Sequence, residues 1–78
     1  MHKNEMTENT SIRSTVIEAY ETLQKYGYNP VNQLVGYLIS GDPTYITAKE
    51  RARFKIQKIE KDAILEDIVR WYIEHVLQ

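Results

Sequence analysis

The helix-breaking residues of this chain are confined to one segment. All three glycines and both prolines lie within residues 26–46, and neither residue type occurs on either side of it. Outside the segment, apolar residues recur at three- and four-residue steps, and no stretch alternates as a strand does. The sequence therefore predicts an all-α fold, a small bundle of about four short helices with helix-turn-helix-like elements. The segment itself is interpreted as a tightly specified connector.

The polar start of the chain is expected to stay outside the bundle. Residues 1–10 carry too little apolar surface to offset the entropy of ordering, so we expect a flexible N-terminal tail. Residues 11–78 then form a single helical domain. Its first helix is expected over residues 12–26, with Ser11 or Thr10 as the N-cap.

Glycine and proline positions bound the second expected helix. Gly27 supplies the left-handed residue that ends the first helix, and Asn29 followed by Pro30 is typical of an N-cap with proline in the first turn. This second helix is expected to end before Gly41. Gly36 in its middle costs about 1 kcal/mol relative to alanine, which indicates a close contact with another helix at that point.

Two further helices are expected in the C-terminal part of the chain. The run Thr47-Ala48-Lys49-Glu50 fits a capping box, in which the side chains of Thr47 and Glu50 each bond the other residue's amide. It predicts a third helix that runs to about residue 60. Asp62 is the best available N-cap for a break, so a fourth helix is expected over residues 63–77.

Composition excludes several classes of function. The chain has no cysteine, and His2 and His75 are too few and too far apart for a histidine-based metal site. The net charge of −1 argues against a general nucleic-acid or membrane-surface binder, and no apolar run approaches the roughly 18 residues of a membrane span. No nucleophile–base pair or glycine-rich phosphate loop is found, and Asp42 is interpreted as a turn residue. We therefore expect a cytoplasmic, non-enzymatic protein without cofactor or metal.

The fourth expected helix is apolar over most of its circumference. Its hydrophobic residues cover an arc of roughly 240°, well beyond the ~100° stripe of a helix with one buried side. A homodimer would cover this surface, and a central position in a monomeric bundle is the alternative. The residues expected at the dimer interface are Phe54, Leu65, Ile68, Trp71, Tyr72 and Val76.

The third expected helix is strongly basic. Six of the ten basic residues of the chain lie between positions 49 and 61, and Arg51, Lys55 and Lys58 are the candidate partner-binding or phosphate-binding residues. The alternatives are a nucleic-acid-binding helix-turn-helix module and a solvated face that balances the acidic fourth helix. Phe54 lies among these cations. It is either covered by the bundle or by a partner chain, or exposed as an anchor for another protein.

Two threonines in the tail are candidate phosphorylation sites. Thr7 and Thr10 lie three residues apart in a polar, accessible stretch, which is what a kinase requires. A phosphate there would also lie near the start of the first helix, where the helix dipole favours negative charge. Threonine is common in tails, so an unmodified, solvated role is the alternative.

The connector resembles the signature of a known family. Residues 26–46 read Tyr-Gly-Tyr-Asn-Pro-Val-Asn-Gln-Leu-Val-Gly-Tyr-Leu-Ile-Ser-Gly-Asp-Pro-Thr-Tyr-Ile, and residues 52–53, 59–62 and 64–69 continue the likeness. In these segments the chain is similar to the IreB family of small regulatory phosphoproteins from low-GC Gram-positive bacteria. Residues 1–10 lack the aromatic-containing stretch that usually precedes the first helix in that family.

The resemblance implies a regulatory role and several partners. It implies a helical homodimer without catalytic activity, phosphorylated by a membrane-anchored Ser/Thr kinase with extracellular PASTA domains and dephosphorylated by a PP2C-type phosphatase. Thr7 and Thr10 match the spacing of the family's phosphoacceptor threonines. The implied role is negative regulation in the cell-wall stress pathway that governs cephalosporin resistance, through a downstream protein that the sequence does not name.

Overall fold

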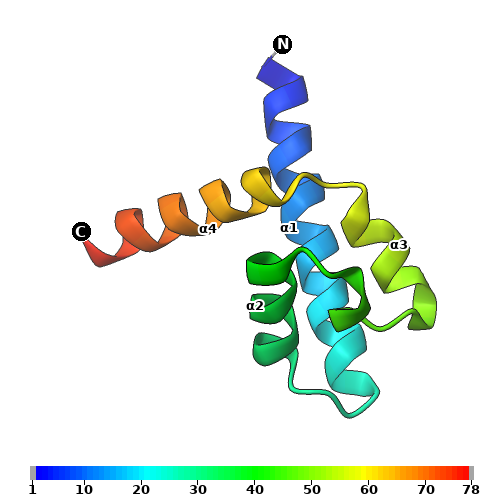
Figure 1. Cartoon of the computed structure of the whole chain (residues 1–78). Helices are drawn as coiled ribbons and strands as arrows, with labels where there is room; N and C mark the ends of the chain where they lie inside the picture. Colours follow the sequence, from blue (N-terminus) through cyan, green and yellow to red (C-terminus); the bar gives the residue numbers. More distant parts are fainter. Residues whose placement is uncertain (1, 78) are drawn as a thin grey trace.

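Helices make up nearly all of the described chain (Figure 1). The structure, a computed structural model, describes the backbone of residues 2–77 and the side chains of residues 11–77. The elements in chain order are α1 (His2–Lys25), α2 (Pro30–Ser40), the 3-10 turns η1 (Pro43–Tyr45) and η2 (Lys49–Arg51), α3 (Ala52–Gln57) and α4 (Lys61–Val76). No strand occurs in residues 2–77, so the all-α prediction is confirmed.

The long helix α1 is the element around which the others are arranged. In Figure 1, α2 and α3 lie along its C-terminal part, whereas α4 meets it further up and projects away from the other helices. α1 begins at His2, so the expected start near residue 12 with a cap at Ser11 or Thr10 is wrong. Residues 2–11 contain no glycine or proline that would stop the helix from extending toward the N-terminus. The flexibility expected of residues 1–10 concerns motion and stays a prediction.

The turn between α1 and α2 forms as its residues predict. Gly27 has a φ of 88°, and the amide of Tyr28 donates to the carbonyl of Leu23 at 3.0 Å, the pattern of a Schellman ending. The Asn29 side chain accepts a hydrogen bond from the amide of Asn32 at 3.1 Å and caps α2. Local backbone chemistry therefore fixes this turn.

The turn after α2 folds back onto the helix that it leaves. A Cβ atom at Gly36 would lie 2.5 Å from Cε1 of Tyr45, so the predicted close contact is with this ring and not with another helix. Gln33 fastens the same turn by donating to the carbonyl of Tyr45 at 2.9 Å. Asp42 is a turn residue as predicted: the amide and hydroxyl of Thr44 donate to its carboxylate at 3.0 and 2.8 Å and hold its pKa below the ordinary value.

The expected capping box at Thr47 does not form. The Thr47 hydroxyl accepts from the amide of Lys49 at 3.2 Å, and Glu50 and Arg51 both adopt left-handed conformations with φ of 53° and 63°. The chain therefore makes an extra turn, and α3 begins at Ala52. The capping-box prediction is wrong because the Glu50 side chain bonds α1 and not its own backbone.

The core lies between α1, α2 and α3, with little from α4. The predicted break before α4 is confirmed, although Glu60 is the N-cap and Asp62 lies inside the first turn. Among the described residues, Ile64 is the one buried residue of α4. The largest fully buried side chains are Leu23, Ile46, Ile56 and Ile64.

Candidate functional site

Phe54 of α3 forms one cluster with Arg51 and Lys58, the residues that flank this helix, called the cation–aromatic cluster below. The Arg51 guanidinium and the Lys58 ammonium lie 4.5 and 4.6 Å from the centre of the Phe54 ring, within range of cation–π interactions. Phe54 is 48% exposed. Within the described side chains, neither cation pairs with a carboxylate. The chain therefore presents two available positive charges fixed beside an aromatic ring.

Two other cations of this segment are used inside the chain. Lys55 lies 3.2 Å from Glu18 of α1, and Nε of Arg53 donates to the carbonyl of Ile46 at 2.8 Å. Of the three residues predicted to bind a partner or phosphate, the structure thus brings Arg51 and Lys58 together and pairs Lys55 elsewhere. The nucleic-acid alternative gains no support from this arrangement, because α3 has six residues and two of its cations have partners within the chain.

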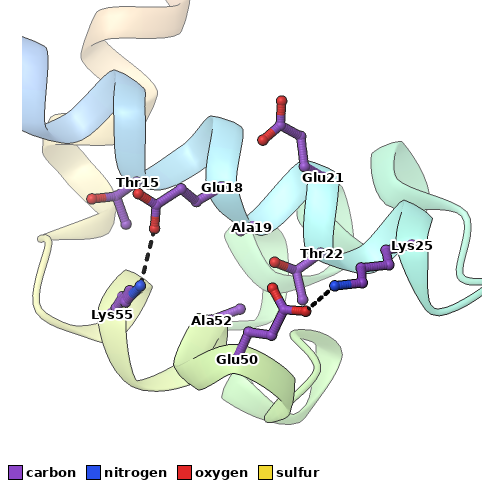
Figure 2. A pocket seen from close by; sticks show the side chains of 9 residues that line it. All are labelled: Thr15, Glu18, Ala19, Glu21, Thr22, Lys25, Glu50, Ala52 and Lys55. Carbon is purple, nitrogen blue, oxygen red and sulfur yellow. Dashed lines mark hydrogen bonds and ion pairs between the residues drawn. The ribbon is translucent and has the colours of Figure 1, made fainter.

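A charged groove lies between α1 and the η2–α3 segment, and two ion pairs across it connect this segment to α1 (Figure 2). The Glu50 carboxylate lies 2.6 Å from Nζ of Lys25 and accepts from the Tyr26 hydroxyl at 3.1 Å. The hydrogen bond from Lys25 holds the pKa of Glu50 below its ordinary value. The Lys55–Glu18 pair lies further along the same groove. Both ion pairs tie the segment that follows η1 to α1.

The backbone at Glu50 and Arg51 carries strain next to the cluster. A left-handed conformation costs roughly 1–3 kcal/mol at each non-glycine residue. The contacts of Glu50 with α1 maintain this conformation, and the strained turn places Arg51 over the ring of Phe54. Sequence reasoning assigned Glu50 to a helix cap and so missed its role in positioning the cluster.

A broad apolar face of α4 is uncovered. Every residue from 68 to 77 is exposed, and Figure 1 shows the helix extending beyond the other three. Phe54, the sixth residue predicted at the dimer interface, belongs to the cation–aromatic cluster on α3. The other five predicted interface residues share the α4 surface, called the α4 face below: Leu65, Ile68, Trp71, Tyr72 and Val76.

An apolar groove extends the α4 face onto α2. Val31 and Val35 of α2, Val16 of α1 and Ile68 of α4 line this groove together with other aliphatic side chains. Ile39, one turn beyond Val35 on the same side of α2, is 82% exposed. Large contiguous apolar patches are uncommon on monomeric proteins and mark surfaces that another molecule covers.

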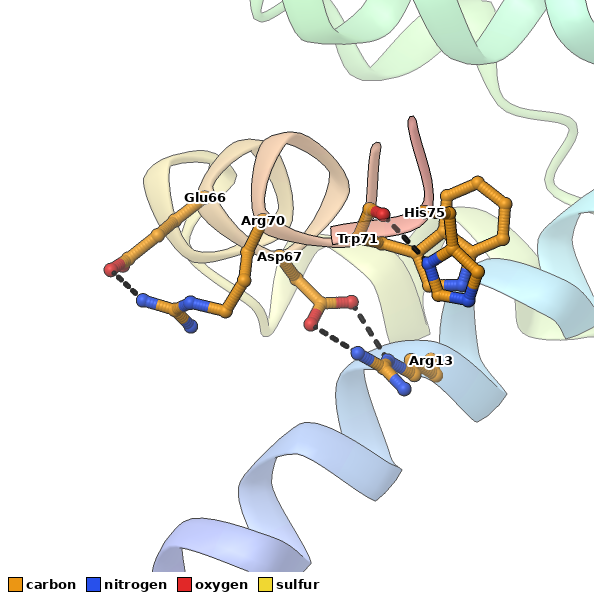
Figure 3. Close-up of polar contacts among 6 residues, drawn as sticks. All are labelled: Arg13, Glu66, Asp67, Arg70, Trp71 and His75. Atoms are coloured by element: carbon orange, nitrogen blue, oxygen red, sulfur yellow. Dashed lines mark hydrogen bonds and ion pairs between the residues drawn. The ribbon is translucent and has the colours of Figure 1, made fainter. Parts of the chain in front are cut away.

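One two-pronged ion pair joins α1 to α4 (Figure 3). Nε and Nη2 of Arg13 each donate to the Asp67 carboxylate at 2.9 Å. The side chain of Asp67 is 13% exposed and that of Arg13 is 56% exposed. The hydrogen bond from Arg13 holds the pKa of Asp67 below its ordinary value, and the same bond raises the pKa of Arg13. Sequence reasoning missed this pair because 54 residues separate its members.

The other polar contacts drawn in Figure 3 stay within α4. Arg70 pairs with Glu66 at 2.9 Å, and His75 stacks on Trp71 with 4.0 Å between ring centres. Nδ1 of His75 also lies 2.8 Å from the carbonyl of Trp71. These contacts order the surface of α4 without attaching the helix to the rest of the chain.

The two candidate phosphoacceptors lie on α1. Thr7 and Thr10 fall within its range, and their side chains lie outside the described residues. Within the part of the chain that the structure describes, no group of three or more acidic, histidine or cysteine side chains could hold a metal ion. In that same part, none of the helices combines the length and hydropathy needed to cross a membrane.

Comparison with known proteins identifies the family. The family model described as "IreB regulatory phosphoprotein" matches residues 1–74. A UPF0297 protein from Acetivibrio thermocellus is 49% identical over 65 residues, which cover 83% of this chain and 72% of that relative. The resemblance drawn from residues 26–46 is thereby confirmed. The chain belongs to the IreB family, a family of regulatory phosphoproteins and not a known enzyme family.

Proposed function

We propose that this chain is a cytoplasmic, non-enzymatic regulator controlled by phosphorylation of Thr7 and Thr10. The proposed kinase is a membrane-anchored Ser/Thr kinase with extracellular PASTA domains, opposed by a PP2C-type phosphatase. The observation that carries the proposal is the family match, because it spans both threonines and describes a regulatory phosphoprotein. The proposed output is negative regulation of the cell-wall stress pathway that governs cephalosporin resistance, through a downstream protein.

The proposed working unit is a homodimer built on the α4 face. Covering exposed apolar surface contributes roughly 25 cal/mol per Å² removed from water, and most of α4 is uncovered in the single chain. The apolar groove beside α2 continues this face and offers a complementary surface to the same helix of a second copy. The support for this proposal is the extent and continuity of that apolar surface.

The cation–aromatic cluster is the proposed docking site for an anionic group. Arg51 and Lys58 hold their charges beside Phe54, where a carboxylate or phosphate can bind both. A phosphate on Thr7 adds up to about two negative charges, which would either occupy this site or repel an acidic partner from it. Lys55, predicted at the same site, contributes only if it leaves Glu18.

Phosphosite mapping tests the proposal directly. The chain is incubated with the catalytic domain of a PASTA-type kinase, and the phosphorylated residues are identified by mass spectrometry. We expect phosphate on Thr7 and Thr10, loss of each site in Thr7→Ala and Thr10→Ala, and no loss in the matched control Ser14→Ala. An unmodified chain, beside a control substrate that the same kinase phosphorylates, would contradict the proposal.

Charge reversal tests the docking site separately. In cells that carry Thr7→Glu, we expect Arg51→Glu combined with Lys58→Glu to abolish the change in cephalosporin resistance that Thr7→Glu alone produces. Lys49→Glu is the matched control, because Lys49 lies beside the ring of Tyr26 and outside the cluster. An unchanged Thr7→Glu phenotype in the double reversal would remove the cluster from the mechanism.

A further inference from the structure

Arg13 lies where α1 contacts α4, a few residues after the two proposed phosphorylation sites on α1. The guanidinium has five N–H donors in a planar fork, and two of them, on Nε and Nη2, are directed at Asp67. The side chain is more than half exposed. Arg13 therefore keeps donors on its exposed side that a second anion can reach.

Thr10 lies one turn before Arg13 on the same face of α1. Residues three apart in a helix are surface neighbours, with Cβ atoms about 5–6 Å apart, and both positions fall inside α1. A phosphate on Thr10 would lie within reach of the Arg13 guanidinium. Thr7 is six residues from Arg13 and lies roughly 120° away around the helix, so its phosphate would not.

A phosphate competes effectively with the Asp67 carboxylate for this guanidinium. It carries about −1.5 to −2 charges at neutral pH and three strong acceptor oxygens, and arginine binds phosphate in the same two-pronged geometry as carboxylate. Two anions that share one guanidinium repel each other. Phosphate on Thr10 therefore weakens the contact between Arg13 and Asp67.

The contact with Asp67 attaches α4 to α1, and buried Ile64 is a second attachment of the helix. Among the described residues, it is the ion pair that links α4 to another helix. Ile64 is the buried anchor of α4, and Ile68 and the residues after it are exposed. Without the ion pair, the first turn stays anchored by Ile64, and the remaining turns can reorient together with the α4 face.

We propose that Arg13 is a phosphate-binding residue, which exchanges Asp67 for a phosphate on Thr10 and so couples phosphorylation to the orientation of α4. The inference rests on the proposed function, since that function supplies the phosphate. It adds a phosphomonoester site distinct from the cation–aromatic cluster. It also gives the two threonines different roles, because only Thr10 shares a face of α1 with Arg13.

The test uses full-length chains made by chemical synthesis, each with one phosphothreonine, at position 10 or at position 7. Titration by ³¹P NMR gives the second pKa of each phosphate, and ¹³C-labelled Asp67 gives the pKa of its carboxyl. We expect the phosphate at position 10 to titrate at lower pH in the native sequence than in a chain that lacks the Arg13 guanidinium, and phosphate at position 7 to leave the pKa of Asp67 unchanged. We also expect phosphate at position 10 to raise the pKa of Asp67, because the hydrogen bond from Arg13 is the main interaction that lowers it.

Arg13→Gln is the deciding variant. In this background, the phosphate at position 10 should titrate at higher pH than it does in the native sequence. The α4 amide spectrum of unphosphorylated Arg13→Gln should match that of the chain phosphorylated at position 10. Circular dichroism confirms that the variant remains helical. Asp67→Asn is a second variant that lacks the ion pair between α1 and α4 and keeps Arg13.

Two outcomes overturn the inference: a phosphate pKa at position 10 that Arg13→Gln does not change, or an Asp67 pKa that does not respond to phosphate at position 10. Kinase recognition plays no part in this experiment, because the phosphate is installed by synthesis. Failure of the kinase to modify Thr10 would therefore contradict the proposed function and leave the phosphate site intact. Failure here would leave the kinase assignment intact.

Discussion

The turns within the segment from Gly27 to Ile46 complete their interactions within one chain, whereas α4 does not. In the segment, Asn29 caps α2, Gln33 holds the following turn and the ring of Tyr45 fills the space over Gly36. In α4, every residue after 67 is exposed. The difference indicates that the first region serves the stability of the single chain, and that the second serves contacts the single chain cannot make.

The largest effect is expected in the connector. Ile46→Ala removes a fully buried side chain and should lower the free energy of unfolding by about 2–5 kcal/mol. Ile39→Ala is the matched control, because Ile39 is mostly exposed and its loss should change stability by less than about 0.5 kcal/mol. Urea unfolding followed by circular dichroism measures both. Equal effects would mean that the connector is not part of the core.

A smaller effect is expected at the contact between Gly36 and Tyr45. Gly36→Ala forces the new methyl into the ring and should cost about 1–3 kcal/mol, partly offset by a helix-propensity gain of about 1 kcal/mol. In a Tyr45→Ala background the clash is absent, so the same substitution should be stabilising. Urea unfolding of all four chains gives the coupling energy. Equal effects of Gly36→Ala in both backgrounds would exclude the proposed clash.

The same comparison predicts a different response from α4. Tyr72→Ser should change the free energy of unfolding of the dilute chain by less than about 0.5 kcal/mol, because the side chain is exposed. It should weaken self-association at least about tenfold, since a buried aromatic contributes over 1.4 kcal/mol. Sedimentation measures association, with Glu66→Gln as control. A large loss of stability in the dilute chain would show that Tyr72 packs within one copy.

The smallest effect is a pH dependence at the junction of α1 and α4. Because the folded-state pKa of Asp67 is lowered, its pair with Arg13 stabilises the fold above the unfolded carboxyl pKa of about 4. That stability is lost as the pH falls through the folded-state pKa. Asp67→Asn should therefore flatten part of the decline in melting temperature below about pH 4. An unchanged acid profile would mean that the pair does not stabilise the folded chain.

Sequence reasoning succeeded where the determining chemistry is local. Gly27, Asn29, Gly41 and Asp42 act through backbone conformation or bonds to near neighbours, and their roles were predicted correctly. It failed at Glu50, where a local capping motif competes with a bond to Lys25, 25 residues away. The Arg13–Asp67 pair was missed for the same reason, since nothing in the local pattern of α1 distinguishes Arg13 as a partner of α4.

The candidate surfaces were predicted in part. The apolar arc of α4 followed from residue spacing alone, and the structure leaves that arc exposed. Residue spacing did not predict which basic residues are paired within the chain and which are available, because the partners of Lys55 and Arg53 depend on how α3 packs. Helix periodicity assigns residues to a face, whereas tertiary contacts decide which of their charges remain available.

The left-handed conformation of Arg51 implies a trade-off between stability and recognition. Glycine accepts that conformation without strain, so Arg51→Gly would relieve roughly 1 kcal/mol of backbone strain while deleting one of the two charges beside Phe54. A more stable chain is thus one substitution away. The strained backbone at this point coincides with the guanidinium that lies over Phe54, so stability and the charge of the cluster are coupled at one residue.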